Sequence, residues 1–286
     1  MRLFRYLDAE AGLATLREGA FKVTRPNQFN DPFEYLFQVR AGRRLFRKSF
    51  QQLPEITTVI KTRVNALLEK AGYTKPSPSL VRATKLKVIE ELRNEFYTNW
   101  ETKVDKTIRN RLEMLSRTTG VACLTTEKNH PLMWSHYADG HKGMVIEIET
   151  ETAFPQPPTI IDIKYVDEPP EYDFLDGDLP NTPIVQKHFM DTVLGRKSTI
   201  WKYEKEQRIQ FDIAILKHTT TPLGEELLLF EIPKAAIKSV ILGCRFPQSW
   251  ISDFEKITSH YDYRLLSRYT ATPSTREYKL IYNAIK

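Results

Sequence analysis

The sequence predicts an α+β fold, in which a mixed, mainly antiparallel β-sheet core carries an inserted helical hairpin. Three observations support this class: a strand, helix and strand pattern at the start, one long segment with apolar residues three or four apart, and repeated period-two alternation after Gly120. With 41% hydrophobic and 27% charged residues, the chain has a globular composition, and we expect one domain over residues 1–286.

The chain opens with a predicted β-α-β unit. Residues 3–6 alternate like a strand, residues 8–18 have the periodicity of a short helix, and residues 20–24 return as a strand. Gly19 follows the helix as a favourable C-cap residue. The proline and asparagine residues of the next segment, RPNQFNDPFE, indicate a turn.

A helical hairpin is predicted within residues 50–117. Residues 56–70 form its first helix, the segment YTKPSPS interrupts it, and residues 79–117 form the second helix. The apolar stripe of the second helix comprises Leu86, Ile89, Leu92, Phe96, Trp100, Val104, Ile108, Leu112 and Leu115. The stripe suits ordinary packing, and the hairpin is also a candidate arm for a protein partner.

Six strands are predicted after Gly120, at residues 121–124, 144–149, 160–165, 208–213, 227–232 and 240–242. Between them, residues 168–183 form a loop rich in proline and aspartate, too polar for a core and long enough to act as a lid.

Charge and cysteine content indicate the kind of partner and the cellular compartment of the protein. The formal charge of +6 favours acidic partners such as nucleic acid or a nucleotide, and basic residues gather in segments 40–48 and 85–117. Cys123 and Cys244 lie among apolar residues without CxxC spacing, which predicts small buried thiols in a reducing compartment. We find neither a signal peptide nor a membrane span and expect a cytoplasmic protein without a membrane partner.

The first motif that could carry chemistry is FNDPFE. Asp31 is a candidate N-cap for a helix with Pro32 first and Glu34 third, which is a capping box. Capping does not explain Asn30. The free N–H groups at such a helix start could also hold a phosphate.

The second motif, MWSHYADGHKG, is predicted as a helix from Pro131 that ends at Gly140, followed by a turn at Gly143 and a strand. Its functional side chains are Trp134, Ser135, His136, Tyr137, Asp139, His141 and Lys142. The histidines are five residues apart, a spacing that does not suit two zinc ligands on one helical face, so we expect no metal site. Each histidine is open to a structural or a catalytic role.

The third motif, KSTIWKYEKEQRI, contains Lys197 and the alternating residues Glu204, Glu206 and Arg208. On a strand, these three side chains would share one face. They could form a surface ion-pair ladder, or in a cleft the carboxylates could stabilise a developing cation while the arginine holds a phosphate.

Together with the opening LFRY and the later VILGCRF, these motifs resemble the bacterial domain-of-unknown-function family numbered 2971, whose members often lie beside mobile or phage-defence genes. The pattern also resembles, at a distance, the ADP-ribosyltransferase fold. That resemblance implies an NAD site with Arg5 or Tyr6 first, Ser135 or Tyr137 second, and Glu206 last, with Glu204 completing an E-x-E. NAD would then be the substrate, and the protein a candidate toxin or phage-defence effector.

The chemistry of nicotinamide loss assigns roles to these residues. A carboxylate must stabilise the oxocarbenium-like ribose, an aromatic ring must contact nicotinamide, and a cation must hold the pyrophosphate. Glu206, Tyr137 and either Arg5 or Arg208 could supply these groups. We therefore expect Arg5, Tyr6, Asn30, Tyr137, Glu206 and Arg208 to converge on one pocket.

Two other functions stay open. Asp162 and Lys164 form a D-x-K after the acidic strand that contains Glu147 and Glu149, and these carboxylates could hold Mg²⁺ in a metal-dependent nuclease. Alternatively, the protein could be a non-enzymatic module that binds nucleic acid or protein through its basic helices.

Overall fold

The computed structural model describes residues 1–34, 38–41, 50, 55–174, 189–221 and 223–285. The chain forms two compact units. The larger comprises Met1–Leu36, Met114–Pro169 and Val193–Lys286, and the smaller comprises Phe37–Glu113 and Pro170–Thr192. Each is described by itself, and the expectation of one domain over residues 1–286 stays a prediction.

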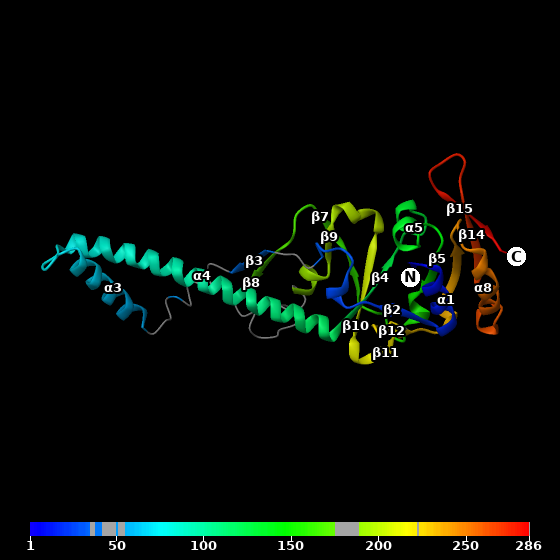
Figure 1. Ribbon diagram of the computed structural model, residues 1–286, viewed down its shortest axis with the longest axis horizontal. Helices are drawn as coiled ribbons and strands as arrows, with labels where there is room; N and C mark the ends of the chain where they lie inside the picture. Colours follow the sequence, from blue (N-terminus) through cyan, green and yellow to red (C-terminus); the bar gives the residue numbers. More distant parts are fainter. Residues whose placement is uncertain (35–37, 42–49, 51–54, 175–188, 222, 286) are drawn as a thin grey trace. The chain divides into compact units, whose positions relative to one another are not determined.

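An eight-stranded sheet forms the centre of the larger unit (Figure 1). Its order is β15-β14-β13-β5-β1-β4-β10-β6, and all neighbours are antiparallel except β13 and β14. The strands are β1 (Arg2–Leu7), β4 (Thr119–Thr125), β5 (Met144–Glu149), β6 (Ile160–Asp162), β10 (Glu206–Asp212), β13 (Ile237–Leu242), β14 (Ser267–Pro273) and β15 (Leu280–Ala284). The predicted mixed, mainly antiparallel sheet is confirmed.

Apolar side chains cover both faces of this sheet because successive residues of a strand point to opposite sides. On one face, Leu3 packs in a core with Leu13 of α1 (Ala9–Glu18) and Phe254 of α8 (Ile251–Thr258). On the other face, Phe4 and Tyr6 pack with residues of α5 (Pro131–Tyr137). Strand β1 is therefore fixed from both sides.

Shorter elements complete the larger unit. Strands β11 (Lys217–Thr220), β12 (Glu226–Glu231) and β2 (Ala20–Val23) form an antiparallel sheet, and β7 (Lys164–Val166) pairs in parallel with β9 (Arg196–Ser198). The short helices are η1 (Pro26–Gln28), α6 (Thr150–Ala153), η2 (Thr199–Glu204), η3 (Ile213–Ile215), η4 (Lys234–Ala236), η5 (Gln248–Trp250) and η6 (Tyr261–Tyr263).

The smaller unit contains the predicted helical hairpin. Helix α3 (Ile56–Lys70) lies beside α4 (Pro78–Thr118), and Val64 and Leu68 of α3 pack with Val88 and Leu92 of α4 (Figure 1). Strands β3 (Gln38–Ala41) and β8 (Glu171–Phe174) pair in parallel. Both helices are confirmed.

Some local predictions were wrong. Leu86 was placed on the apolar stripe but is 61% exposed, and Val88 is buried instead. The single strand at residues 160–165 is divided into β6 and β7. The segment 168–183 contains β8, whose Tyr172 is fully buried, and its residues 175–183 lie outside the described part of the chain.

The structure confirms that α1 ends at Gly19, which has a left-handed φ of 65°. None of the helices in the described ranges is both long enough and apolar enough to span a bilayer.

Candidate functional site

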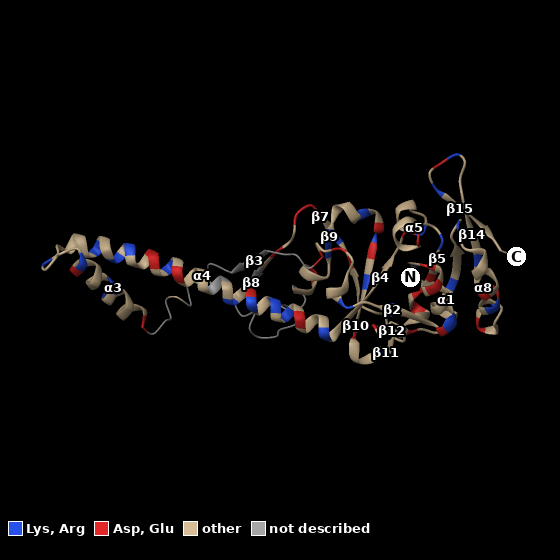
Figure 2. Ribbon diagram, viewed as in Figure 1, with Lys and Arg blue, Asp and Glu red and all other residues tan. Residues whose placement is uncertain are grey.

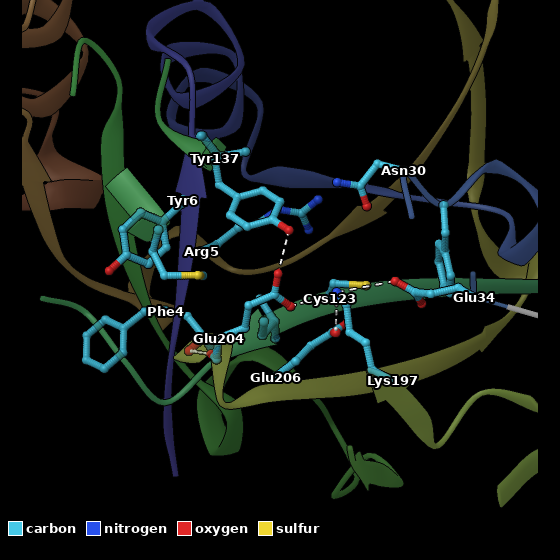
Figure 3. Close-up of a pocket in the computed structure, with 15 residues that line it drawn as sticks. Phe4, Arg5, Tyr6, Asn30, Glu34, Cys123, Tyr137, Lys197, Glu204 and Glu206 are labelled. Carbon is cyan, nitrogen blue, oxygen red and sulfur yellow. Dashed lines mark hydrogen bonds and ion pairs between the residues drawn. The ribbon is translucent and has the colours of Figure 1, made fainter. Parts of the chain in front are cut away.

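A pocket of about 190 Å³ lies within the larger unit (Figure 3). Residues of β1, β4, α5, η2 and the turn around Asn30 contribute to it. It is lined by Phe4, Arg5, Tyr6, Leu7, Phe29, Asn30, Glu34, Cys123, Leu124, Thr125, Met133, Tyr137, Lys197, Glu204 and Glu206. A cavity of about 150 Å³ can hold benzene, so this pocket has room for one ring-sized group.

The pocket brings together side chains from all three sequence motifs. Of the residues expected to converge, Arg5, Tyr6, Asn30, Tyr137 and Glu206 line it. Arg208 does not line it but is bonded to Glu206, with 2.7 Å between Arg208 Nε and Glu206 Oε1. The geometry places these residues at one site, and their functional roles stay predictions.

A buried ion network forms one side of the pocket. Lys197 Nζ lies 2.7 Å from Glu204 Oε2, 3.2 Å from Glu206 Oε2 and 3.2 Å from Glu34 Oε1. Arg208 donates to Glu206, to Glu34 and to the carbonyl oxygen of Leu194. All five charged side chains are at most 5% exposed. The network is therefore no surface ion-pair ladder, and its three carboxylates face two cations.

The surroundings shift the pKa values of Glu204 and Glu206 in opposite directions. Burial raises the pKa of Glu204 and outweighs the opposing effect of Lys197. Burial also acts to raise the pKa of Glu206, but Arg208 and Lys197 overcome it and lower that pKa to about 2. Glu206 is therefore ionised at neutral pH, whereas Glu204 accepts a proton more readily than an ordinary glutamate.

Tyr137 connects α5 to Glu204 across the pocket (Figure 3). Its hydroxyl donates to Glu204 Oε1 over 2.6 Å. Burial, followed by the Glu204 carboxylate, raises the pKa of Tyr137, so the phenol stays protonated and can act as this donor. The backbone carbonyl of Glu204 accepts a hydrogen bond from Thr125, which fixes the end of η2 against β4.

The backbone position of Glu204 differs from the one that the sequence predicted. It does not lie on a strand with Glu206 but at the end of η2, and β10 begins at Glu206. Lys205 between them has a left-handed φ of 44°. This kink changes the chain direction between the two carboxylates, and both still bond to Lys197.

Arg5 is the cation of the pocket with no acidic partner among the described residues. Its Nη2 donates to the carbonyl oxygen of Lys22 over 2.7 Å and its guanidinium lies over the Phe21 ring, but its buried Nη1 has no hydrogen-bond partner. Burial lowers the pKa of Arg5 to about 10, so it stays charged at neutral pH. Arg208 is committed to protein groups, whereas Arg5 has a donor left for an anionic ligand group.

Sequence reasoning missed two ionisable residues of the pocket lining, Glu34 and Cys123. Glu34 was assigned to a capping box, but its carboxylate bonds to Lys197 and Arg208. Asp31 does cap, because its Oδ1 accepts from the backbone N–H of Phe33 over 2.9 Å, yet the described residues Pro32 to Glu34 form a turn rather than a helix. The sequence carried no signal for this role, because Lys197 and Arg208 lie more than 160 residues along the chain.

Cys123 is the second missed residue. We predicted a buried core thiol, but its side chain is exposed to the pocket. Desolvation by the surrounding protein, together with the nearby Glu206 carboxylate, raises the pKa of Cys123 well above that of an ordinary thiol. Its place on β4, beside Arg208 of β10, gives it this orientation.

The other predicted binding residues of the second motif lie outside the pocket lining. Trp134 is fully buried on the sheet, and its ring stacks on His141 with 6.0 Å between ring centroids. Ser135 donates to the carbonyl oxygen of Pro131 over 3.1 Å. His136 lies among the aromatic rings of Trp201 and Tyr203. The structural role left open for the two histidines fits these contacts.

The carboxylates proposed for a nuclease do not form one site. Glu147 and Glu149 lie on β5, and Asp162 lies on β6, with β1, β4 and β10 between them. Four strand spacings correspond to about 19 Å, too far for one magnesium ion. Within the described ranges, no group of three or more His, Cys, Asp or Glu side chains is placed to hold a metal ion.

Comparison with known proteins gives one result. No curated protein and no solved structure matches the chain. Residues 133–209, which include Tyr137, Lys197, Glu204, Glu206 and Arg208 of the site, match the model of a family described as "Protein of unknown function (DUF2971)", and over these residues the chain is similar to that family.

Proposed function

We propose that the pocket binds the nicotinamide end of NAD and cleaves its N-glycosidic bond, as an ADP-ribosyltransferase-like enzyme. The observation that carries this proposal is the pair of adjacent carboxyls with opposite pKa shifts in a ring-sized pocket. Environments that separate the pKa values of two acidic groups are typical of sites where each has its own catalytic role.

Each of the two carboxyls has its own role in the proposed reaction. The bond between nicotinamide N1 and ribose C1′ breaks, its electron pair leaves with nicotinamide, and the ribose develops oxocarbenium character. The ionised Glu206 stabilises that cation. A water molecule or an acceptor nucleophile adds to C1′, and its proton passes to Glu204.

The remaining pocket residues suit the parts of this substrate. The pocket volume matches the nicotinamide ring, so the adenosine end lies outside it. Tyr137 presents an aromatic surface, and the free donor of Arg5 favours it over Arg208 as the phosphate contact. Loss of cellular NAD is the action expected of a toxin or phage-defence effector.

Release of nicotinamide from NAD by the purified chain, followed by liquid chromatography, tests the proposal. Glu204→Gln is expected to reduce the rate at least a hundredfold by removing the proton acceptor. Glu127→Gln is the matched control, because Glu127 pairs with exposed Lys205 outside the pocket lining. Intact NAD, with water and with a cell extract as acceptor source, would refute the proposal, as would equal activity of the two variants.

Labelling of Cys123 separates binding from cleavage. Because the raised pKa leaves little thiolate, a maleimide should react slowly at pH 7, and NAD should slow it further by filling the pocket. Cys244→Ser leaves Cys123 as the one labelled thiol. Protection by nicotinamide without turnover would indicate a binding site that does not cleave NAD.

A further inference from the structure

The positive charge of this protein is concentrated in one segment. Residues 37–113 contain 17 Lys and Arg against 8 Asp and Glu, whereas the rest of the chain contains 25 against 28. Within that segment, residues 61–87, here called the hairpin end, contain seven basic residues and one acidic residue, Glu69. The sequence prediction placed the basic residues of the helices at 85–117, where eight basic residues are largely offset by six acidic ones.

The basic side chains of the hairpin end are all exposed; they are Lys61, Arg63, Lys70, Lys75, Arg82, Lys85 and Lys87. Arg63 pairs with Glu95 over 2.9 Å. The other six have no ion-pair partner in the described part of the chain. Lys61 and Lys70 lie on α3, Lys75 lies in the connection, and the other three lie on the first turns of α4, where Figure 2 shows basic residues in blue. Their charge is therefore available to a partner.

Packing between the two helices explains this exposure. Val64 and Leu68 of α3 pack with Val88 of α4, which uses the apolar faces of both helices. The polar faces then point to solvent. Along α3, the distance from Lys61 to Lys70 is about 14 Å at the helical rise per residue. A duplex presents about eight phosphate charges over that length.

We propose that the hairpin end binds nucleic acid through the phosphate backbone. Unpaired cations on a folded surface are the feature that such binding needs. An anionic membrane is less favoured, because an interfacial helix needs a broad exposed apolar face and here that face is buried between the helices. Tyr73, 49% exposed at the connection between the helices, can stack on an unpaired base.

Fluorescence anisotropy with labelled 20-nucleotide single-stranded and duplex DNA tests this proposal on the full chain. With about six phosphate contacts, the association constant should fall about a thousandfold between 50 and 200 mM salt. The substitutions Lys70→Gln, Lys75→Gln, Arg82→Gln and Lys85→Gln together should lower the logarithmic salt slope by about 3 to 4. Tyr73→Ala should weaken single-strand binding about tenfold and leave duplex binding unchanged.

A charge-matched variant provides the control. Arg17→Gln, Lys164→Gln, Lys256→Gln and Arg276→Gln remove four exposed cations outside the hairpin and should leave the slope unchanged. Equal weakening of both quadruple variants would overturn the proposal. So would binding to phosphatidylserine vesicles without binding to either DNA. Glu204→Gln should bind DNA like the parent, so failure of the NAD proposal leaves this test intact.

Discussion

At the scale of single residues, Glu204 and Glu206 show how a site can differentiate two identical side chains. Both bond to Lys197, but only Glu206 also receives Arg208, whereas Glu204 receives the neutral hydroxyl of Tyr137. A second full charge lowers the pKa of a buried carboxyl far more than a phenol does. The second charge therefore lets the cations overcome burial at Glu206, whereas at Glu204 burial prevails.

Glu206→Gln should lower the free energy of unfolding at pH 7 by about 3–5 kcal/mol, because it leaves two buried cations short of one carboxylate. A folded pKa of about 2 lies below the unfolded value of 4.5, so this stabilisation is present above pH 4.5 and is lost as the pH falls toward 2. Denaturant unfolding of parent and variant should thus give curves that converge in acid.

Glu127→Gln is the surface control for this experiment. Its ion pair with Lys205 is half-exposed and should contribute at most about 1 kcal/mol. A stability difference for Glu206→Gln that stayed constant from pH 7 to pH 2 would show that ionisation of this carboxyl does not stabilise the fold.

At the scale of elements, the turn between α5 and β5 shows why the second motif contains glycine. A Cβ atom at Gly143 would lie 1.9 Å from the backbone carbonyl oxygen of Leu7. Gly143 also bonds through its carbonyl to the backbone N–H of Gly243 over 2.9 Å. Close approach of three backbone segments, rather than chemistry, therefore requires this glycine.

Gly143→Ala should reduce the thermal stability strongly, by about 3 kcal/mol or more, because the clashing atoms are backbone and cannot rotate away. Gly140→Ala is the comparison within the same motif. Gly140 has a φ of 58° but open space around it, so alanine there should cost only about 1–2 kcal/mol. Equal melting temperatures of the two variants would contradict the packing argument.

Elements with a strong local signal were predictable, and the site was predictable only in part. The alternation of residues 144–149 and the cap at Gly19 each carry their own information, so β5 and the end of α1 were placed correctly. The orientation of Cys123 and the partners of Glu34 depend on strand neighbours far along the chain. No local pattern encodes such contacts. The left-handed turn at Lys205 was also not predictable, because such turns are recognised in a sequence by glycine and this position is a lysine.

At the scale of the whole molecule, the two units should respond to mutation separately. Leu92→Ala removes a side chain that is 1% exposed in the hairpin core and should cost about 2–5 kcal/mol there. Amide hydrogen exchange, followed by mass spectrometry, should become faster in α3 and α4 and stay unchanged in β1, β4 and β5.

Leu86→Ala is the matched control on the same helix, because Leu86 is 61% exposed and should have little effect. Faster exchange throughout the eight-stranded sheet in Leu92→Ala would show that both units unfold together, as the single domain expected from the sequence would.

The central position of β1 has a consequence for how freely the inserted segment can vary. Phe4 of β1 pairs with Thr125 of β4, and Arg2 pairs with Glu149 of β5. Pairing of β1 with these strands therefore closes a loop of more than a hundred residues. The entropy lost on closing such a loop grows only with the logarithm of its length, about 0.6 kcal/mol for each doubling. Lengthening or shortening the helical hairpin between β3 and β4 would therefore change the closure entropy of the sheet very little. The helices can lengthen or shorten over evolutionary time while the strands keep their partners.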